Sequence, residues 1–127
     1  STTDVCVPIS ALAECVAQTA ADMDQAPFPY TIVGHVGDGN FHVLMLLDAD
    51  SQEEWDESER LNHRLVERAI AMQGTCTGEH GVGLHKMEFM LAEHGQDALD
   101  VMSSIKQALD PHNIMNPGKM LPPRPLD

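Results

Sequence analysis

The stretch of sequence that decides the fold is Tyr30-Thr31-Ile32-Val33-Gly34-His35-Val36-Gly37-Asp38-Gly39-Asn40-Phe41-His42-Val43-Leu44-Met45-Leu46-Leu47. It holds two runs rich in β-branched and apolar residues, 30–36 and 41–47, on either side of Gly37-Asp38-Gly39-Asn40. An Asp-Gly pair between two such runs is a strong signal for a β-hairpin. The stretch therefore predicts two antiparallel strands joined by a tight turn.

Helical patterns stand on both sides of this hairpin. A short strand-like segment at residues 3–8 comes first, and Ser10 then caps the first expected helix. Ser51-Gln52-Glu53-Glu54 has the form of a capping box and opens a second helix, which Gly74 ends. The order strand, helix, strand, strand, helix predicts an α+β fold of the ferredoxin-like type, with helices on one face of an antiparallel sheet.

The last third of the chain predicts a helical extension. Apolar residues at helical spacing mark one short helix that ends at Gly95 and another that ends before Asp110-Pro111. Asn116-Pro117-Gly118-Lys119 then has Pro and Gly in the central places of a type II turn, and Pro122-Pro123-Arg124-Pro125 is expected to be extended.

Composition excludes several classes of protein. The 127 residues suit one compact unit, and no apolar run reaches the ~20 residues that cross a bilayer. The net charge of −13 would repel a phosphate backbone, so nucleic acid is not an expected partner. The three cysteines are widely spaced, which indicates neither a disulfide framework nor a thiolate zinc site.

Two histidines carry the first signal of chemistry. If Asp38 and Gly39 form a two-residue hairpin loop, His35 lies directly across from His42, with Cβ atoms ~4.5–5.5 Å apart on one face of the sheet. Two imidazoles at that separation can converge on one metal ion. A cross-strand histidine pair without metal remains the alternative interpretation.

A second signal lies in residues 74–83, a segment too rich in glycine for a helix or a central strand. It contains Glu79 next to His80. Two histidines and one carboxylate form the ligand set of a catalytic metal with open positions, and a neighbouring histidine can serve as a base. A solvated Glu-His pair on a flexible loop is the competing interpretation.

Three motifs together carry a resemblance: His35-Val36-Gly37-Asp38-Gly39-Asn40-Phe41-His42, then Gly74-Thr75-Cys76-Thr77-Gly78-Glu79-His80-Gly81-Val82-Gly83, then Asn116-Pro117-Gly118-Lys119. They resemble the C-terminal domain of FAD-linked oxidases of the vanillyl-alcohol oxidase superfamily. The branch of D-lactate, glycolate and D-2-hydroxyglutarate dehydrogenases is similar in all three motifs, and Thr75-Cys76-Thr77 is most similar to the cytochrome-type D-lactate dehydrogenases. Leu44 stands where the other branches often have an amide-bearing residue.

The resemblance implies roles for particular residues. His35, His42 and Glu79 would hold a divalent metal, zinc or manganese, and His80 would be the catalytic base. Asn40 would lie near substrate or flavin, and Asn116 would approach the isoalloxazine. The implied reaction oxidises a D-2-hydroxyacid with hydride transfer to FAD, and the electrons then pass to cytochrome c or a quinone-linked acceptor.

The start of the chain bears on how much of such an enzyme is present. Ser1 to Val7 shows no initiator Met and no signal-like stretch, so we expect residues 1–127 to be the C-terminal substrate or cap domain of a longer polypeptide. The partner FAD-binding domain would precede Ser1, and the isolated segment would be inactive. Its uncovered apolar face leaves room for homodimerisation. The expected location is cytoplasmic, or peripheral on the inner membrane, and mitochondrial in a eukaryote.

Two other functions compete with this interpretation. A non-haem iron oxygenase also uses two histidines and one carboxylate, but such sites usually occur in all-β barrels, whereas this sequence predicts several helices. A non-enzymatic metal-binding module of ferredoxin-like fold is the other alternative. The identity of the metal separates the oxygenase from the dehydrogenase, and glycolate or D-2-hydroxyglutarate remain alternative substrates to D-lactate.

Overall fold

The computed structural model describes residues 1–122. The chain divides into two compact units, Ser1–His80 and Gly81–Asp127, and each is described by itself. Most of the predicted extended tail, residues 123–127, lies outside the described residues.

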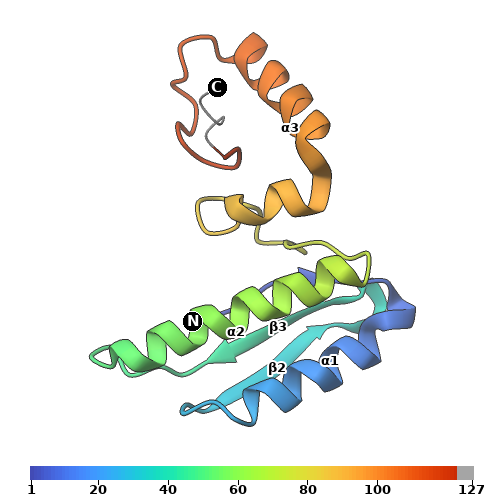
Figure 1. The fold of residues 1–127 in the computed structure, drawn as a ribbon, viewed down its shortest axis with the longest axis vertical. Helices are drawn as coiled ribbons and strands as arrows, with labels where there is room; N and C mark the ends of the chain where they lie inside the picture. Colours follow the sequence, from blue (N-terminus) through green and yellow to red (C-terminus); the bar gives the residue numbers. More distant parts are fainter. Residues whose placement is uncertain (123–127) are drawn as a thin grey trace. The chain divides into compact units, whose positions relative to one another are not determined.

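The first unit is a three-stranded antiparallel sheet with two long helices (Figure 1). Its elements in chain order are β1 (Val5–Cys6), α1 (Ile9–Met23), β2 (Tyr30–His35), β3 (Asn40–Met45) and α2 (Gln52–Ala71). The strand order is β1-β3-β2, so the two strands that α1 connects are separated by β3, which runs antiparallel to both. This is the split βαβ arrangement, and the predicted α+β, ferredoxin-like fold is confirmed.

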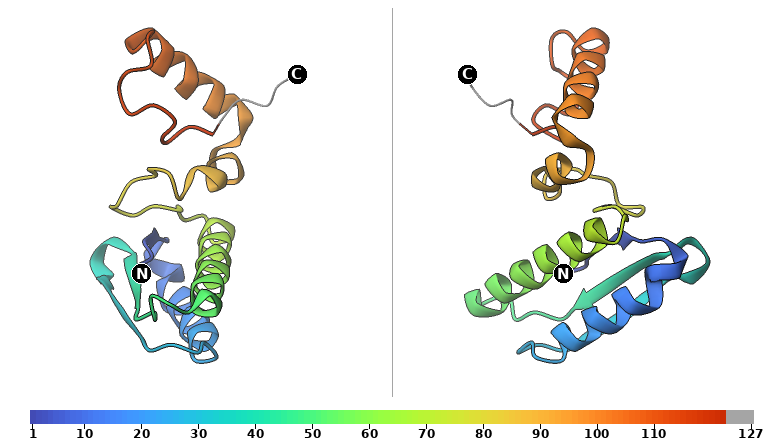
Figure 2. Two further views of the ribbon diagram at one scale, coloured as in Figure 1. Left: turned by 90° about the vertical axis from the view of Figure 1, so that its left-hand side faces the viewer. Right: turned by 45° about the vertical axis from the view of Figure 1, so that its right-hand side comes forward.

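Both helices cover the same face of the sheet (Figure 2). Side chains that alternate along the strands point to this face, and they meet apolar side chains of α1 and α2 in one core. The core residues include Val5, Phe41, Val43, Met45, Leu12, Cys15, Leu61, Leu65 and Ala69. The opposite face of the sheet, which neither α1 nor α2 covers, carries Asp4, His35, Asn40 and His42.

The two helices differ in how they begin. The capping box of α2 is confirmed, because the Ser51 side chain accepts a hydrogen bond from the Glu54 amide. The prediction of Ser10 as the cap of α1 is wrong. That helix begins two residues earlier than expected, at Ile9, and Pro8 is its N-cap residue, without a side-chain hydrogen bond. Proline is compatible with this position because the φ that its ring fixes is one that the backbone can adopt at the start of a helix.

The hairpin is confirmed, but its predicted register is wrong. Residues 36–39 connect the strands, with a 3-10 turn at Val36–Asp38 (η1) and Gly39 in the left-handed region at φ 74°. His35 consequently pairs with Asn40, and Val33 pairs with His42. This register differs from the expected one by two residues, and side chains alternate with a period of two. His35 and His42 thus remain on one face, as diagonal neighbours and not as the directly opposed pair that was expected.

The second unit is the predicted helical extension. It contains a 3-10 turn, η2 (Met87–Phe89), followed by α3 (Met90–Leu109). Gly95 has φ 77° and ψ 165° inside α3, so the regular helix is interrupted where the sequence predicted an end. Beyond α3, Gly118 has φ 68°, which agrees with the predicted turn at Asn116-Pro117-Gly118-Lys119.

Among the described residues, none of the helices has both the length and the apolar character that a membrane crossing requires.

Candidate functional site

The site begins with His42 of β3, which is buried on the face of the sheet that α1 and α2 do not cover. Its Nδ1 lies 3.1 Å from the backbone carbonyl oxygen of Thr3. In the tautomer with its hydrogen on Nδ1, the ring donates to this carbonyl oxygen, and Nε2 is the nitrogen available to a cation. Nε2 lies 3.1 Å from the Oε1 atom of Glu79. The contact with Thr3 therefore turns Nε2 of His42 toward the glycine-rich loop.

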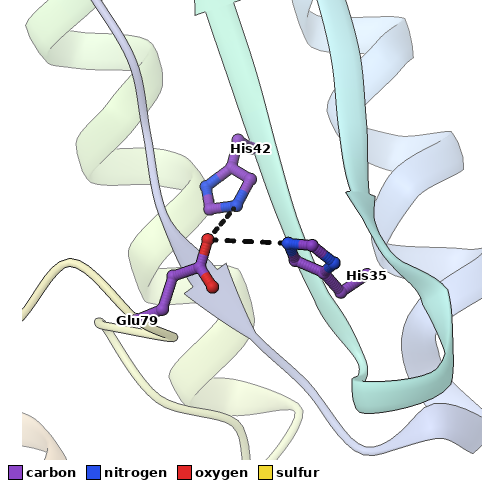
Figure 3. A group of neighbouring side chains, drawn as sticks. All are labelled: His35, His42 and Glu79. Carbon is purple, nitrogen blue, oxygen red and sulfur yellow. Dashed lines mark ion pairs between the residues drawn. The ribbon is translucent and has the colours of Figure 1, made fainter.

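His35 reaches the same carboxylate from the end of β2 (Figure 3). Its Nε2 atom is 3.8 Å from Glu79 Oε1, and the His35 and His42 ring centroids are 6.4 Å apart with nearly perpendicular planes. The ligand atoms of His35, His42 and Glu79 all lie within 4.8 Å of one another. Since zinc binds nitrogen and oxygen at ~2.0–2.2 Å, one cation can contact all three after a small closure.

His80 lies beside this cluster. Its ring stacks on the ring of His42, with centroids 4.9 Å apart and planes inclined by 13°. His80 is exposed, whereas His42 is buried beneath it. In this arrangement His42 can serve as a ligand, while His80 faces the open side of the cluster.

The glycine-rich loop is held by a residue that the sequence analysis did not single out, Asp4. The Asp4 carboxylate is buried, with only 1% of the residue exposed, and it accepts hydrogen bonds from the backbone amides of Gly78, Glu79 and His80 at 2.9–3.3 Å. The alternation in Thr3-Asp4-Val5-Cys6-Val7 contained a usable signal. Val5 and Val7 are core residues, so Asp4 points to the opposite face, where the histidines lie.

Asn40 is also on this face but lies beneath the loop. It is buried, and its Nδ2 donates to Asp4 Oδ1 and to the Val5 carbonyl, both at 2.9 Å. A Cβ atom at Gly78 would lie 1.8 Å from Asn40 Nδ2, so the loop can approach this closely only with glycine there. The amide nitrogen of Asn40 thus supports the loop, while its Oδ1 has no hydrogen-bond partner among residues 1–122. The role of Asn40 toward substrate or flavin stays a prediction.

Cys6 shares the face but is not a thiolate ligand here. Its thiol donates a hydrogen bond to the Asp38 carbonyl at 3.1 Å. Burial, together with the nearby carboxylates of Asp38 and Asp4, raises the pKa of the Cys6 thiol above its ordinary value. Cys6 is therefore a neutral thiol next to a cluster built from nitrogen and oxygen ligands.

Comparison with known proteins decides the family. The family model described as FAD linked oxidases, C-terminal domain, matches residues 1–120. The chain belongs to this family. As a member of the FAD-linked oxidase C-terminal domain family it carries the three motifs in their expected order, and the resemblance seen in the sequence is confirmed.

Several curated proteins are similar to this family member. It is 50% identical over 121 residues to D-lactate dehydrogenase [cytochrome], mitochondrial, of Arabidopsis thaliana, covering 95% of this chain and 21% of that protein. A probable D-lactate dehydrogenase, mitochondrial, of Danio rerio is 50% identical over 94% of this chain and 24% of its own length. The glycolate oxidase subunit GlcD of Bacillus subtilis is 36% identical over 92% and 25%. The chain thus spans about a quarter or less of the length of these relatives.

Asn116 belongs to the second unit of this FAD-linked oxidase domain. The segment before it is anchored by Asp110, whose carboxylate accepts from the amides of Ile114 and Met115 at 3.0 and 2.9 Å and pairs with Lys106. The hydrogen bond from Lys106, helped by the two backbone amides, lowers the pKa of Asp110 below its ordinary value. Asn116 itself has φ 46°, so a defined local backbone presents it. Its role toward flavin stays a prediction.

Proposed function

We propose that the chain is the C-terminal catalytic segment of a flavin-dependent D-2-hydroxyacid dehydrogenase, which oxidises D-lactate or a related D-2-hydroxyacid to the 2-oxoacid. One observation carries the proposal: His35, His42 and Glu79 converge within 4.8 Å, with the ring of His80 stacked beside them, in a chain of this family. The relatives named D-lactate dehydrogenase support the choice of substrate class.

The ligand set fits a divalent metal, zinc or manganese. Two imidazole nitrogens and one carboxylate oxygen suit such an ion, and the contact between His42 Nδ1 and the Thr3 carbonyl leaves Nε2 of that ring free to bind it. When bound, the metal would make the hydroxyl of the acid more acidic, and FAD would accept the C2 hydride. These groups supply the Lewis-acid and redox chemistry, and the protein residues supply positioning and proton transfer.

The proton step falls to His80. Its imidazole is exposed, stacks on a ligand histidine and adjoins Glu79 in sequence, so an acid held at the cluster has its 2-hydroxyl within reach of the ring. A neutral ring nitrogen takes the hydroxyl proton as the C2 hydride leaves. The Thr3 carbonyl fixes the ring of His42, so the ring on which His80 stacks keeps one orientation.

The surface beside the cluster favours a substrate with an apolar side chain. Val33 pairs with His42 across the hairpin, and Leu44 is the next residue of β3 on the same face. They are 48% and 40% exposed, so their side chains are available for contact. A methyl group suits such surroundings better than a second carboxylate does, which favours D-lactate over D-2-hydroxyglutarate.

The proposal assigns the flavin to a domain outside this chain. The amide nitrogen of Asn40 is already engaged by Asp4 and the Val5 carbonyl, and no G-x-G-x-x-G motif for a dinucleotide follows a strand in the sequence. We propose that this FAD domain belongs to the same longer polypeptide, and that cytochrome c or a quinone-linked carrier accepts the electrons in or near mitochondria. The Arabidopsis relative is named for a cytochrome, which supports that acceptor, and both this relative and the one from Danio rerio are named as mitochondrial, which supports the location.

The test compares three histidine variants of the full-length enzyme. His80→Ala should lower kcat by about 10²- to 10⁴-fold while the metal content stays near that of the wild type, because only the base is lost. His42→Ala should lose metal and activity together. His63→Ala is the matched control, since His63 lies on α2 and is half exposed beside Glu67.

Elemental analysis and D-lactate-dependent flavin reduction give the two readouts. Near-normal turnover of His80→Ala would disprove its role as the base. Bound iron with oxygen uptake, in place of zinc or manganese with flavin reduction, would favour the oxygenase instead.

A further inference from the structure

Asp4 collects an unusual number of hydrogen-bond donors for one buried carboxylate. The donors come from the loop 77–80 and from Asn40: the Thr77 hydroxyl at 3.2 Å, three consecutive backbone amides, and the Asn40 side-chain amide at 2.9 Å. Consecutive amides that point at one anion form a nest, which usually binds a ligand anion. Here the nest is filled by a side chain of the protein itself.

The pattern of donors requires a carboxylate rather than an amide. Oδ1 accepts from Asn40 Nδ2 and the Glu79 amide, while Oδ2 accepts from Thr77 and from the amides of Gly78, Glu79 and His80. If asparagine replaced Asp4, its NH₂ group would face donors in either orientation of the amide. Burial of Asp4 leaves little water to compensate, so this replacement should release the loop.

The carboxylate also lies behind the metal-binding face of the cluster. Asp4 Oδ1 is 3.7 Å from His42 Nδ1, on the side of the ring opposite the nitrogen that faces Glu79. Asp4 therefore contacts the loop that supplies Glu79 and His80. It also lies next to the ring of His42, which is proposed to bind the metal together with Glu79.

We propose that Asp4 is a positioning residue, which fixes Glu79 and His80 against His42 through the backbone amides of the loop 78–80. The inference rests on the proposed metal site. It adds to that site the residue that holds the loop bearing Glu79 and His80 in place. It predicts that the charge of Asp4 contributes to metal affinity although Asp4 does not touch the metal.

The first experiment measures zinc binding to the 127-residue chain by calorimetry. Asp4→Asn should raise the zinc Kd by about 10- to 100-fold, the range typical for residues that orient metal ligands. Asp38→Asn makes the same charge change at an exposed position of the hairpin and should leave the Kd within about twofold. Asp22→Asn removes a carboxylate that pairs with Arg68 outside the loop, so it controls for a general loss of stability.

The second experiment needs no metal. Amide hydrogen exchange at Gly78, Glu79 and His80 should be about tenfold faster or more in Asp4→Asn, while the amides of β3 exchange as in the wild type. Unchanged exchange at these three amides would overturn the role of Asp4. A wild-type chain that binds no zinc would instead overturn the proposed metal site, and the exchange data would still decide the role of Asp4.

Discussion

Asp22 on α1 meets two arginines of α2 that differ greatly in exposure. The Arg68 side chain is 10% exposed and also donates to Gln18 and Thr19, whereas the Arg64 side chain is 56% exposed and contacts Asp22 at 3.1 Å. The ion pair between Asp22 and Arg68 therefore joins the two helices at a largely buried position, whereas the ion pair between Asp22 and Arg64 is open to solvent.

We expect the two arginine replacements to differ in their effect on stability. Arg68→Ala should lower the free energy of unfolding by about 2–3 kcal/mol, because it leaves Asp22 and Thr19 without their buried donor. Arg64→Ala should change it by less than about 0.5 kcal/mol, as is typical of exposed ion pairs. Urea unfolding of both variants measures the difference, and equal effects would show that burial does not separate the two pairs.

At the level of single residues, the sequence indicated which side chains gather at the site better than it indicated which residue holds the loop in place. His35, His42 and Glu79 carry side chains whose chemistry is recognisable without a structure, and the three do converge. Asp4 looks ordinary in the sequence, since a single acidic residue in a strand is usually solvated. Its role depends on residues more than seventy positions away, and only tertiary structure reveals such contacts.

At the scale of elements, Gly39 controls the turn of the hairpin. It has φ 74°, its carbonyl accepts from the Val7 amide at 3.0 Å, and a Cβ atom there would lie 2.1 Å from the Val7 carbonyl oxygen. Gly37, two residues earlier, has no atom within 4 Å of such a Cβ position and has no positive φ. The two glycines thus offer a matched comparison within one turn.

Gly39→Ala should destabilise the unit by about 2 kcal/mol or more, from the left-handed conformation and the collision with the backbone of Val7. Gly37→Ala should leave stability unchanged or raise it by up to about 1 kcal/mol, because it restricts only the unfolded chain. Thermal unfolding followed by circular dichroism distinguishes them. A tolerated Gly39→Ala would mean that the turn has another shape in solution.

The same turn explains why the predicted hairpin was correct and its register was not. The Asp-Gly signal locates a reversal of the chain, but a two-residue and a four-residue connection both contain that pair. The choice between them depends on Val7, which pairs with Gly39 from outside the hairpin. The start of α1 was missed because Pro8, and not Ser10, is the N-cap residue of the helix.

For the whole molecule, the buried apolar residues are divided very unequally between the two units. Among the residues that the structure describes, those of the second unit are only Phe89, Met90 and Leu99. The first unit contains all the other described buried apolar side chains, which come from β1, β3, α1 and α2 and from the connecting residues Val7, Phe28 and Cys76. The first unit therefore has a hydrophobic core of its own, whereas the second unit is too small to bury much apolar surface by itself.

A chain that ends after His80 should fold by itself. We expect its helical circular dichroism to persist and its Tm to stay within about 5 °C of that of the 127-residue chain. The complementary segment from Gly81 onward should show little cooperative unfolding when produced alone. An unfolded 1–80 fragment would contradict this division of the molecule.

The proposed ligands and base all lie in the first unit, and the contacts of Asp4 with residues 78–80 have a topological consequence. The chain enters this unit and leaves it at neighbouring points, because a residue near the entry holds the last three residues before the exit. A module with adjoining entry and exit can be carried within a longer polypeptide without separating the segments around it. The junction is also where Glu79 and His80 lie, beside the other two proposed site residues, His35 and His42.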